Sequence, residues 1–310
     1  MRFDVRRPTW FGLVAVLTGV VMVVSVAGCA QPSAADEPEQ LSDLVARVVK
    51  ASPDRDSATY RPPSRDIAQS IAAGVSELLK SGHAELGRYE LETVSVSGQS
   101  RTDSPGRILA LVERGDPTDG NGLYVARERP AAESPLIVQV PHPVADQKTE
   151  LMGTQLFSET QARLFMMAGA HRRAGDDSAD VAHRTDTTFA AVSDAVVQKG
   201  TTVVQLHGFS SRDHDDDYGD VVLSSSVPTP SRSVRRLAAD LEDHGFDTCT
   251  YDGKKCRALG ATTNVQAVAA RARGADFIHI EVNQNIRKDR SERRDLMRVI
   301  ADSLRDSGIG

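Results

Sequence analysis

The chain has 310 residues, of which 40% are hydrophobic and 26% are charged, and its formal net charge is -6. This length and this apolar content are enough for one sizeable globular core. Acidic and basic residues are interspersed, so the sequence lacks the clustered basic face that is typical of nucleic-acid binding. We therefore expect no nucleic-acid partner.

The first 29 residues have the pattern of an export signal. Three arginines within the first seven residues precede an apolar run over residues 10–26, which ends in Ala-Gly-Cys29. This order resembles a bacterial lipoprotein signal, in which the cysteine after a small-residue box is lipidated and becomes the new N-terminus. The resemblance places the lipid on Cys29. The alternative is an uncleaved transmembrane anchor, because the run approaches the roughly 20 residues that span a bilayer.

Either interpretation places the protein at the cell membrane, with its domain outside the cytoplasm. Residues 30–40 lack periodic apolar positions and are rich in Pro, Ser, Ala and acid, which predicts a disordered tether. The remaining residues, 41–310, are predicted to form a single α/β hydrolase-like domain.

Cys249 and Cys256 bracket a turn-rich stretch that contains Asp252-Gly253. In an exported protein, two close cysteines around a turn favour a disulfide. A metal site is the weaker interpretation, because no second Cys or His pair lies nearby.

Two helices and a group of strands are predicted for the first part of the domain. Apolar residues at helical spacing predict helices over residues 41–49 and 67–79, with Ser64 as the cap of the second helix and Gly82 as its stop. Strand-like runs separated by turn residues predict a hairpin or meander over residues 89–125.

After residue 136 the pattern alternates between strand and helix. Such alternation predicts an α/β fold with a mixed, largely parallel sheet and helices on both faces, of the phosphorylase/hydrolase-like kind, preceded by the two N-terminal helices. The predicted strands cover residues 136–140, 163–167, 202–206, 221–224 and 277–282, and the predicted helices cover 149–161, 187–198, 231–244 and 292–305.

Three apolar strands are each predicted to end in a group that can bind metal or move protons, namely His142, His207 and Glu281. Ligands of open α/β sheets bind outside the carboxyl ends of the strands, so these side chains can converge. A catalytic zinc typically has three protein ligands and one open position. His142, His207 and either Asp146 or Glu150 supply such a set, although the two acids also suit the start of a helix.

Glu281 is the candidate general base, because amide hydrolysis needs a carboxylate that is free to carry a proton. A period of two places His279 and Glu281 on one face of their strand and aliphatic residues on the other. We interpret His279 as a partner of the ligands, with a core histidine as the alternative. Arg172 follows a predicted strand and can clamp a substrate carboxylate, with a solvated basic loop as the alternative.

The order of these motifs resembles the N-formylglutamate amidohydrolases and the phage-type poly-γ-glutamate hydrolases, both related to zinc carboxypeptidases. The resemblance implies a zinc carboxypeptidase-like fold, zinc held by His142, an acidic residue and His207, and Glu281 as the base. It covers roughly residues 136–305 and is carried by Pro141-His142 with Asp146-x-x-Thr149, Asp180-Val-Ala-His-Arg184, Leu206-His-Gly208, and Ile280-Glu-Val-Asn283 followed by Arg287.

The resemblance also ranks the remaining candidates. Poly-γ-glutamate hydrolases have a threonine three residues after their acidic ligand, which favours Asp146 over Glu150. Arg184 stands where these families have an arginine that binds a carboxylate or polarises the scissile carbonyl, so a catalytic role is predicted for it. Asp180 and Arg287 belong to the same motifs and are predicted, together with Arg172, to bind substrate.

The leading hypothesis is a membrane-anchored, extracytoplasmic zinc hydrolase that cleaves an amide or peptide bond next to a carboxylate. Its substrate would be a small molecule or a cell-wall or γ-glutamyl compound. The alternative is a catalytically inactive ligand-binding or cell-envelope lipoprotein on the same fold. The presence of all three metal candidates together with Glu281 favours the enzyme.

Overall fold

The computed structural model describes residues 38–58, 60–96, 107–128, 134–213 and 218–310. The predicted signal and Cys29 lie outside these residues, as does most of the predicted tether. Pro38–Gly310 forms one compact unit. Among its described helices, none is both long enough and apolar enough to cross a bilayer.

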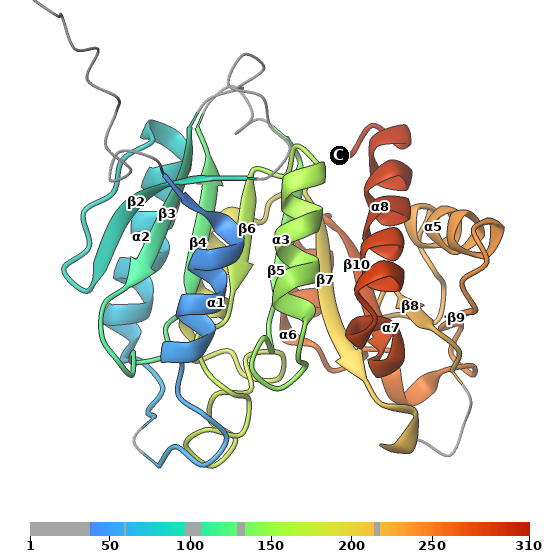
Figure 1. The fold of residues 1–310 in the computed structure, drawn as a ribbon, viewed down its shortest axis with the longest axis horizontal. Helices are drawn as coiled ribbons and strands as arrows, with labels where there is room; N and C mark the ends of the chain where they lie inside the picture. Colours follow the sequence, from blue (N-terminus) through green and yellow to red (C-terminus); the bar gives the residue numbers. More distant parts are fainter. Residues whose placement is uncertain (1–37, 59, 97–106, 129–133, 214–217) are drawn as a thin grey trace, which may run out of the picture. The chain divides into compact units, whose positions relative to one another are not determined.

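One sheet runs through the described residues, with the strand order β1-β2-β3-β4-β6-β5-β7-β10-β8-β9 (Figure 1). The central strands β6, β5, β7 and β10 are mutually parallel, whereas β2, β3, β4 and β6 pair antiparallel. The predicted mixed, largely parallel sheet is confirmed. The strands are β1 (Glu39–Gln40), β2 (Tyr89–Ser95), β3 (Ile108–Glu113), β4 (Leu123–Arg127), β5 (Leu136–Val140), β6 (Leu164–Met167), β7 (Thr202–Phe209), β8 (Val221–Ser224), β9 (Thr248–Thr250) and β10 (Asp276–Asn283).

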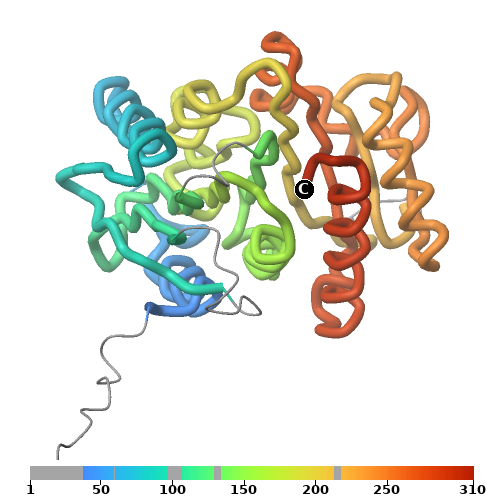
Figure 2. The backbone as a smooth tube through the Cα atoms, turned by 90° about the horizontal axis from the view of Figure 1, so that it is seen from above, coloured from blue at the N-terminus to red at the C-terminus, as the bar shows by residue number. Residues whose placement is uncertain are grey.

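Helices cover both faces of this sheet, as predicted. Helices α1, α3, α5 and α8 pack on one face, and α2, α4 and α6 pack on the other; seen from above, α1 in blue and α2 in blue-green lie on opposite sides (Figure 2). The helices are α1 (Leu41–Ala51), α2 (Arg65–Ser81), α3 (Thr149–Glu159), α4 (Thr188–Val196), α5 (Arg232–Asp243), α6 (Val265–Ala272), α7 (Gln284–Lys288) and α8 (Arg290–Asp306).

The strands of the sheet divide their apolar side chains between two cores. Successive strand residues point to opposite faces, so Ile137 of β5 packs with α2 and α4 while Val138 packs with α1 and α3. The predicted caps of α2 are also present, because Ser64 Oγ accepts the N–H of Ile67 and Gly82 ends the helix with φ +71°. The strands around residues 136–210 are therefore covered on both sides, and their free ends are where ligands can enter.

The end of the predicted tether is ordered, so that prediction is wrong for Glu39 and Gln40. These residues form β1 and pair in parallel with Val94 and Ser95 at the edge of the sheet. The Gln40 amide donates to Ser95 Oγ at 2.7 Å, which fixes the register. Main-chain pairing thus orders a segment that apolar periodicity does not reveal.

The region around the cysteines contains more regular structure than a turn. The predicted disulfide between Cys249 and Cys256 is present, and Cys249 lies in the middle of β9, which pairs with β8. Helix α6 was not predicted, because half of its eight residues are alanine and it has few large apolar residues. Its start is marked by Asn264, whose side chain accepts the N–H of Ala267.

Candidate metal centre

The register of the central strands brings a row of polar side chains onto one face of the sheet. Gln139 of β5 is level with Gln205 of β7, which is level with His279 of β10, and His207 is level with Glu281. The alternate residues of β10 are aliphatic and belong to the core under α3 and α8. The prediction that His279 and Glu281 share a face is confirmed, and the row ends at the carboxyl ends of the strands.

His142 lies two residues beyond β5 and is completely buried. Its Nε2 atom is 2.9 Å from Asp180 Oδ1. An ionised carboxylate can only accept, so Nε2 carries a proton, and in the neutral ring Nδ1 has a free lone pair. Nδ1 is buried and has no hydrogen-bond partner among the described residues. One strong acceptor is therefore left for a ligand.

The protonation of His207 is set by a relay that starts at the backbone of α6. The N–H of Ala267 donates to Asn264 Oδ1 at 3.0 Å, so the amide nitrogen of Asn264 faces Gln205 and donates to its Oε1 at 2.6 Å. Because Oε1 is thereby an acceptor, His207 Nε2, 2.9 Å away, must donate to it. His207 Nδ1 is then a free acceptor as well.

The other end of the Gln205 amide is oriented independently. Its nitrogen donates to Gln139 Oε1 at 2.9 Å and to Gln266 Oε1 at 3.4 Å, while Gln266 donates to the carbonyl of Val181. Sequence reasoning missed this buried amide network. The available signal was a glutamine inside each of two apolar strands, since a buried polar group requires partners.

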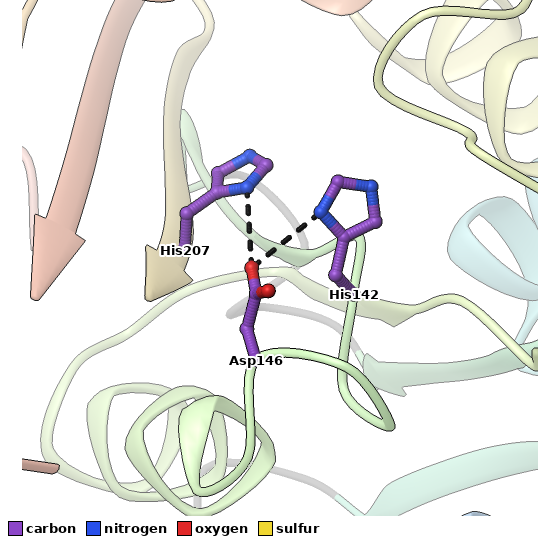
Figure 3. A group of neighbouring side chains, drawn as sticks. All are labelled: His142, Asp146 and His207. Atoms are coloured by element: carbon purple, nitrogen blue, oxygen red, sulfur yellow. Dashed lines mark ion pairs between the residues drawn. The ribbon is translucent and has the colours of Figure 1, made fainter. Parts of the chain in front are cut away.

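Asp146 brings a carboxylate to both histidines (Figure 3). Its Oδ2 lies 3.5 Å from the Nδ1 atoms of both His142 and His207, and it accepts the N–H of Gly208 at 3.2 Å. A separation of 3.5 Å is long for a hydrogen bond. It matches the roughly 3.3–3.5 Å between ligand atoms around a tetrahedral zinc with bonds of about 2.0–2.2 Å. The three atoms that would coordinate a metal lie within 4.8 Å of one another, so the residues present fit zinc.

The charge states of Asp146 and His207 also suit a cation, whereas an ion at His142 would have to displace a proton from the ring. Burial raises the pKa of Asp146, but the two imidazoles outweigh this effect and hold its pKa well below the usual range. Burial lowers the pKa of His207 to about 4, so that imidazole is neutral. Burial lowers the pKa of His142 too, yet Asp146 and Asp180 more than offset it and the net shift is upward. An anionic carboxylate beside a neutral imidazole is what zinc requires.

Glu281 and His279 stand directly beside this group. Glu281 Oε1 is 3.8 Å from His279 Nε2, and the His279 ring centroid is 4.7 Å from that of His207. Burial raises the pKa of Glu281 well above its ordinary value, and the charge of Asp146 raises it further. A bound cation would oppose that shift and favour the ionised carboxylate. The structure thus places the His279 ring next to both His207 and Glu281.

Glu150, the alternative ligand, is not brought to the histidines. It lies on the first turn of α3, is buried, and does not belong to the group that His142, Asp146 and His207 form. Burial raises its pKa, and the charge of Arg293 lowers it. The geometry therefore selects Asp146.

Asp180 stands behind the metal centre. Its two oxygens accept from His142, from Arg172 Nη2 at 2.6 Å and from His183 Nδ1 at 3.1 Å. It lines neither of the cavities described below, so the structure places it as the residue that orients His142. Arg172 lines both cavities and is well placed for a substrate, as predicted from its sequence position.

Arg287 is buried against the loop that follows His207. It donates to the carbonyls of Val282 at 3.0 Å, Phe209 at 3.2 Å and Gln147. It also lies across Gly208, where an added Cβ would be 2.3 Å from the guanidinium carbon. Any larger residue would displace the Arg287 guanidinium from these carbonyls, which explains the His-Gly pair. Arg287 therefore braces the site, and it also lines the second cavity.

Arg184 is not brought to the centre. Its Nε donates to Asp186 Oδ1 at 2.9 Å, and the side chain lines neither cavity beside the metal ligands. The local pairing of an arginine with an acid two residues later is an interaction that motif order does not anticipate.

Two cavities open from the metal centre. The first, about 230 Å³, lies between the centre and residues 257–264, and the second, about 370 Å³, lies beside residues 208–210 and 284–287. His207, Glu281 and Arg172 line both. A larger groove of about 700 Å³ between α2 and α4 contains none of the site residues, so size alone does not identify the site. The ligands lie where the two smaller cavities meet.

No protein-family model matches the sequence, and no curated protein is similar to it. Among solved structures, the chain is similar to an N-formylglutamate amidohydrolase from Ralstonia eutropha, with 14% identity, coverage of 56% of this chain and 93% of that chain, and a TM-score of 0.38. An aspartoacylase family protein from Mesorhizobium loti shows 12% identity, 71% coverage of each chain and a TM-score of 0.43. A putative carboxypeptidase A from Shewanella denitrificans shows 12% identity, 77% and 68% coverage, and a TM-score of 0.41. Similarities at this level establish neither a family nor an activity for this chain.

Proposed function

We propose that this chain is a zinc-dependent hydrolase that cleaves amide or peptide bonds next to a carboxylate. The observation that carries the proposal is the convergence of the Nδ1 atoms of His142 and His207 and the Oδ2 atom of Asp146, with the partly buried carboxylate of Glu281 beside them. When both imidazoles are neutral, these three atoms are all acceptors with no donor between them, which favours a cation.

His142, Asp146 and His207 would hold the ion. Zinc bound there supplies a Lewis acid that polarises the scissile carbonyl and lowers the pKa of water toward about 7. Asp180 and Gln205 keep the two imidazoles in the tautomer that presents Nδ1. The protein's own contribution before the reaction is therefore a rigid, correctly protonated ligand set.

Glu281 performs the proton transfers in this proposal. It lines both cavities, so it can take a proton from the attacking water and deliver it to the leaving nitrogen. The pKa of His279 lies well below its usual range because the ring is buried, so His279 stays neutral and does not neutralise Glu281. Arg172 uses one terminal nitrogen on Asp180 and has further N–H groups for a substrate carboxylate.

The proposal includes a location, the outer side of the cell membrane, with a lipid on Cys29. The disulfide between Cys249 and Cys256 supports an oxidising compartment. Cys29→Ser is expected to release the protein from the membrane fraction or to block its maturation. Retention in the membrane with an unchanged mass would favour an uncleaved anchor.

The activity is tested by incubating the zinc-loaded chain with N-acyl amino acids and γ-glutamyl peptides, and with the same compounds carrying a carboxamide in place of the carboxylate. Cleavage of the carboxylates and slow cleavage of the carboxamides is the expected result. If the zinc-loaded protein binds these compounds and never cleaves them, it is a binding lipoprotein instead.

A further inference from the structure

The segment that forms the far wall of the first cavity is a short turn on the disulfide. Cys256 precedes a 3₁₀ helix over Arg257–Leu259, and the chain continues through Gly260 and Ala261 to the cap of α6. Arg257 and Leu259 line the cavity opposite the metal ligands. This turn is where a substrate group that extends away from the scissile bond would end.

Four contacts fix the turn in place. The disulfide ties Cys256 to β9, Ser224 Oγ donates to the carbonyl of Gly260 at 2.8 Å, and Leu259 packs with the apolar cluster around Phe209. Gly260 itself lies against Tyr251, where an added Cβ would be 2.9 Å from the ring. The backbone that carries Arg257 is therefore held from several sides.

The turn also stores backbone strain. Cys256 has φ 49° and Ala261 has φ 52°, so both have left-handed conformations that side chains other than glycine rarely adopt. Such residues persist only where the surrounding structure forces them, and they concentrate at functional sites. Here the strained residues flank the segment that places Arg257.

Arg257 is the uncompensated charge of this cavity. The other arginine that lines it, Arg172, pairs with Asp180, whereas the exposed guanidinium of Arg257 has no ion-pair or hydrogen-bond partner among the described residues. The one acidic residue among the lining residues is Glu281, which lies at the metal end. Thr262 and Thr263, which carry hydroxyl groups, line the same wall. A guanidinium with hydroxyl donors beside it is a composition that binds carboxylates.

We propose that this wall is an anion-binding subsite and that Arg257 selects substrates with a second carboxylate. The inference rests on the proposed function, which locates the scissile bond at the metal centre. The preferred substrate then carries one carboxylate next to the scissile bond and another on the part that occupies the first cavity. Because the turn is fixed in place, Arg257 selects for the distance between the two substrate carboxylates as well as for their charge.

The test compares substrate pairs that differ only by carboxylate and carboxamide at the distal position. N-acetylglutamate and N-acetylglutamine vary the leaving side, and γ-glutamyl-alanine and its α-carboxamide vary the acyl side. Kinetics and equilibrium binding are measured for the zinc-loaded full chain and for Arg257→Gln. Lys254→Gln is the matched control, because it removes the same charge from the same disulfide loop at a residue that lines neither cavity.

For one of the pairs, Arg257→Gln should raise the KM or Kd of the dicarboxylate at least about tenfold and leave its kcat within about twofold. The KM, Kd and kcat of the matching carboxamide should not change. Lys254→Gln should change none of these values. Equal effects on both members of each pair, or no effect, would overturn the subsite while turnover still supports the hydrolase. Arg257-dependent binding without turnover would keep the subsite and refute the hydrolase, and a chain that neither binds nor cleaves any of the four compounds refutes both.

Discussion

Two buried polar clusters of this molecule look alike by composition and differ in their bonding. One lies beside the antiparallel strands, where Glu113 accepts the N–H of Asn121 at 2.8 Å and its side-chain amide at 2.6 Å, and Asn121 Oδ1 accepts from Thr188 at 2.7 Å. The other lies at the ends of the parallel strands, where the acceptor atoms of His142, Asp146 and His207 face one another.

The difference distinguishes a structural cluster from a ligand site. Around Glu113 each of these donors meets an acceptor, so the cluster joins the β3–β4 connection to α4 and needs no ligand. Burial raises the pKa of Glu113, whereas the pKa of Asp146 is held low despite burial. Buried carboxylates therefore cannot be assigned by burial alone, and the direction of each hydrogen bond decides the role.

The largest expected effect comes from exchanging one carboxylate oxygen for nitrogen in the candidate metal centre. Asp146→Asn should lower zinc affinity by more than about a hundredfold, because it removes the anionic ligand while keeping its shape. Glu150→Gln, four residues away, should change the affinity by less than about threefold. Titration with zinc against a competing chelator measures both. A larger effect at Glu150 would move the ligand assignment there.

The next largest effect is expected at Glu281. Glu281→Gln should keep zinc and substrate binding but lower kcat at least about a hundredfold, because general acid–base catalysis typically contributes 10²–10⁴-fold. Metal content and single-turnover rates are the measurements. Loss of zinc from this variant would show that Glu281 is a ligand and that the assignment of the base is wrong.

The residues behind the ligands should have a smaller effect. Gln205→Met keeps the volume but removes the acceptor that fixes the His207 tautomer, and Asp180→Asn weakens the corresponding acceptor for His142. Each should reduce zinc affinity by about 10–100-fold and alter the absorption spectrum of the cobalt-substituted protein. Gln155→Met is the control, because the Gln155 side chain donates to Glu159 and to the carbonyl of Arg294 and lines neither cavity beside the ligands. Unchanged affinity and spectrum in both variants would mean that the relay does not position the ligands.

The smallest effect is expected in the structural cluster, and on stability alone. Glu113→Gln should lower the free energy of unfolding by about 1–3 kcal/mol, because a donor then faces a donor, and should leave zinc affinity unchanged. Since the folded-state pKa of Glu113 is raised, its contribution is fully present below the unfolded pKa and declines as pH rises through the folded pKa. The difference from wild type in chemical denaturation should therefore narrow with rising pH. A loss of zinc would contradict the distinction between the clusters.

The strand ends were predictable from the sequence, because short apolar runs that stop at His142 and His207 locate two candidate ligands without any contact information. Asp146 was ranked over Glu150 by the resemblance to poly-γ-glutamate hydrolases, and the structure places its carboxylate beside both histidines. The amide relay through Gln205 was not predictable, because its partners lie on separate elements that only the sheet register aligns. The role predicted for Arg184 failed for a different reason. Its position in a motif does not reveal that the side chain pairs locally with Asp186.

The central claim is that His142, Asp146 and His207 form a zinc site, and metal content tests it most directly. The chain, purified without chelator, should carry about one zinc, and His142→Ala and His207→Ala should each carry none while remaining folded, because loss of one of three protein ligands severely weakens zinc binding. A folded wild-type chain that contains no transition metal and binds none when zinc is added would contradict the account.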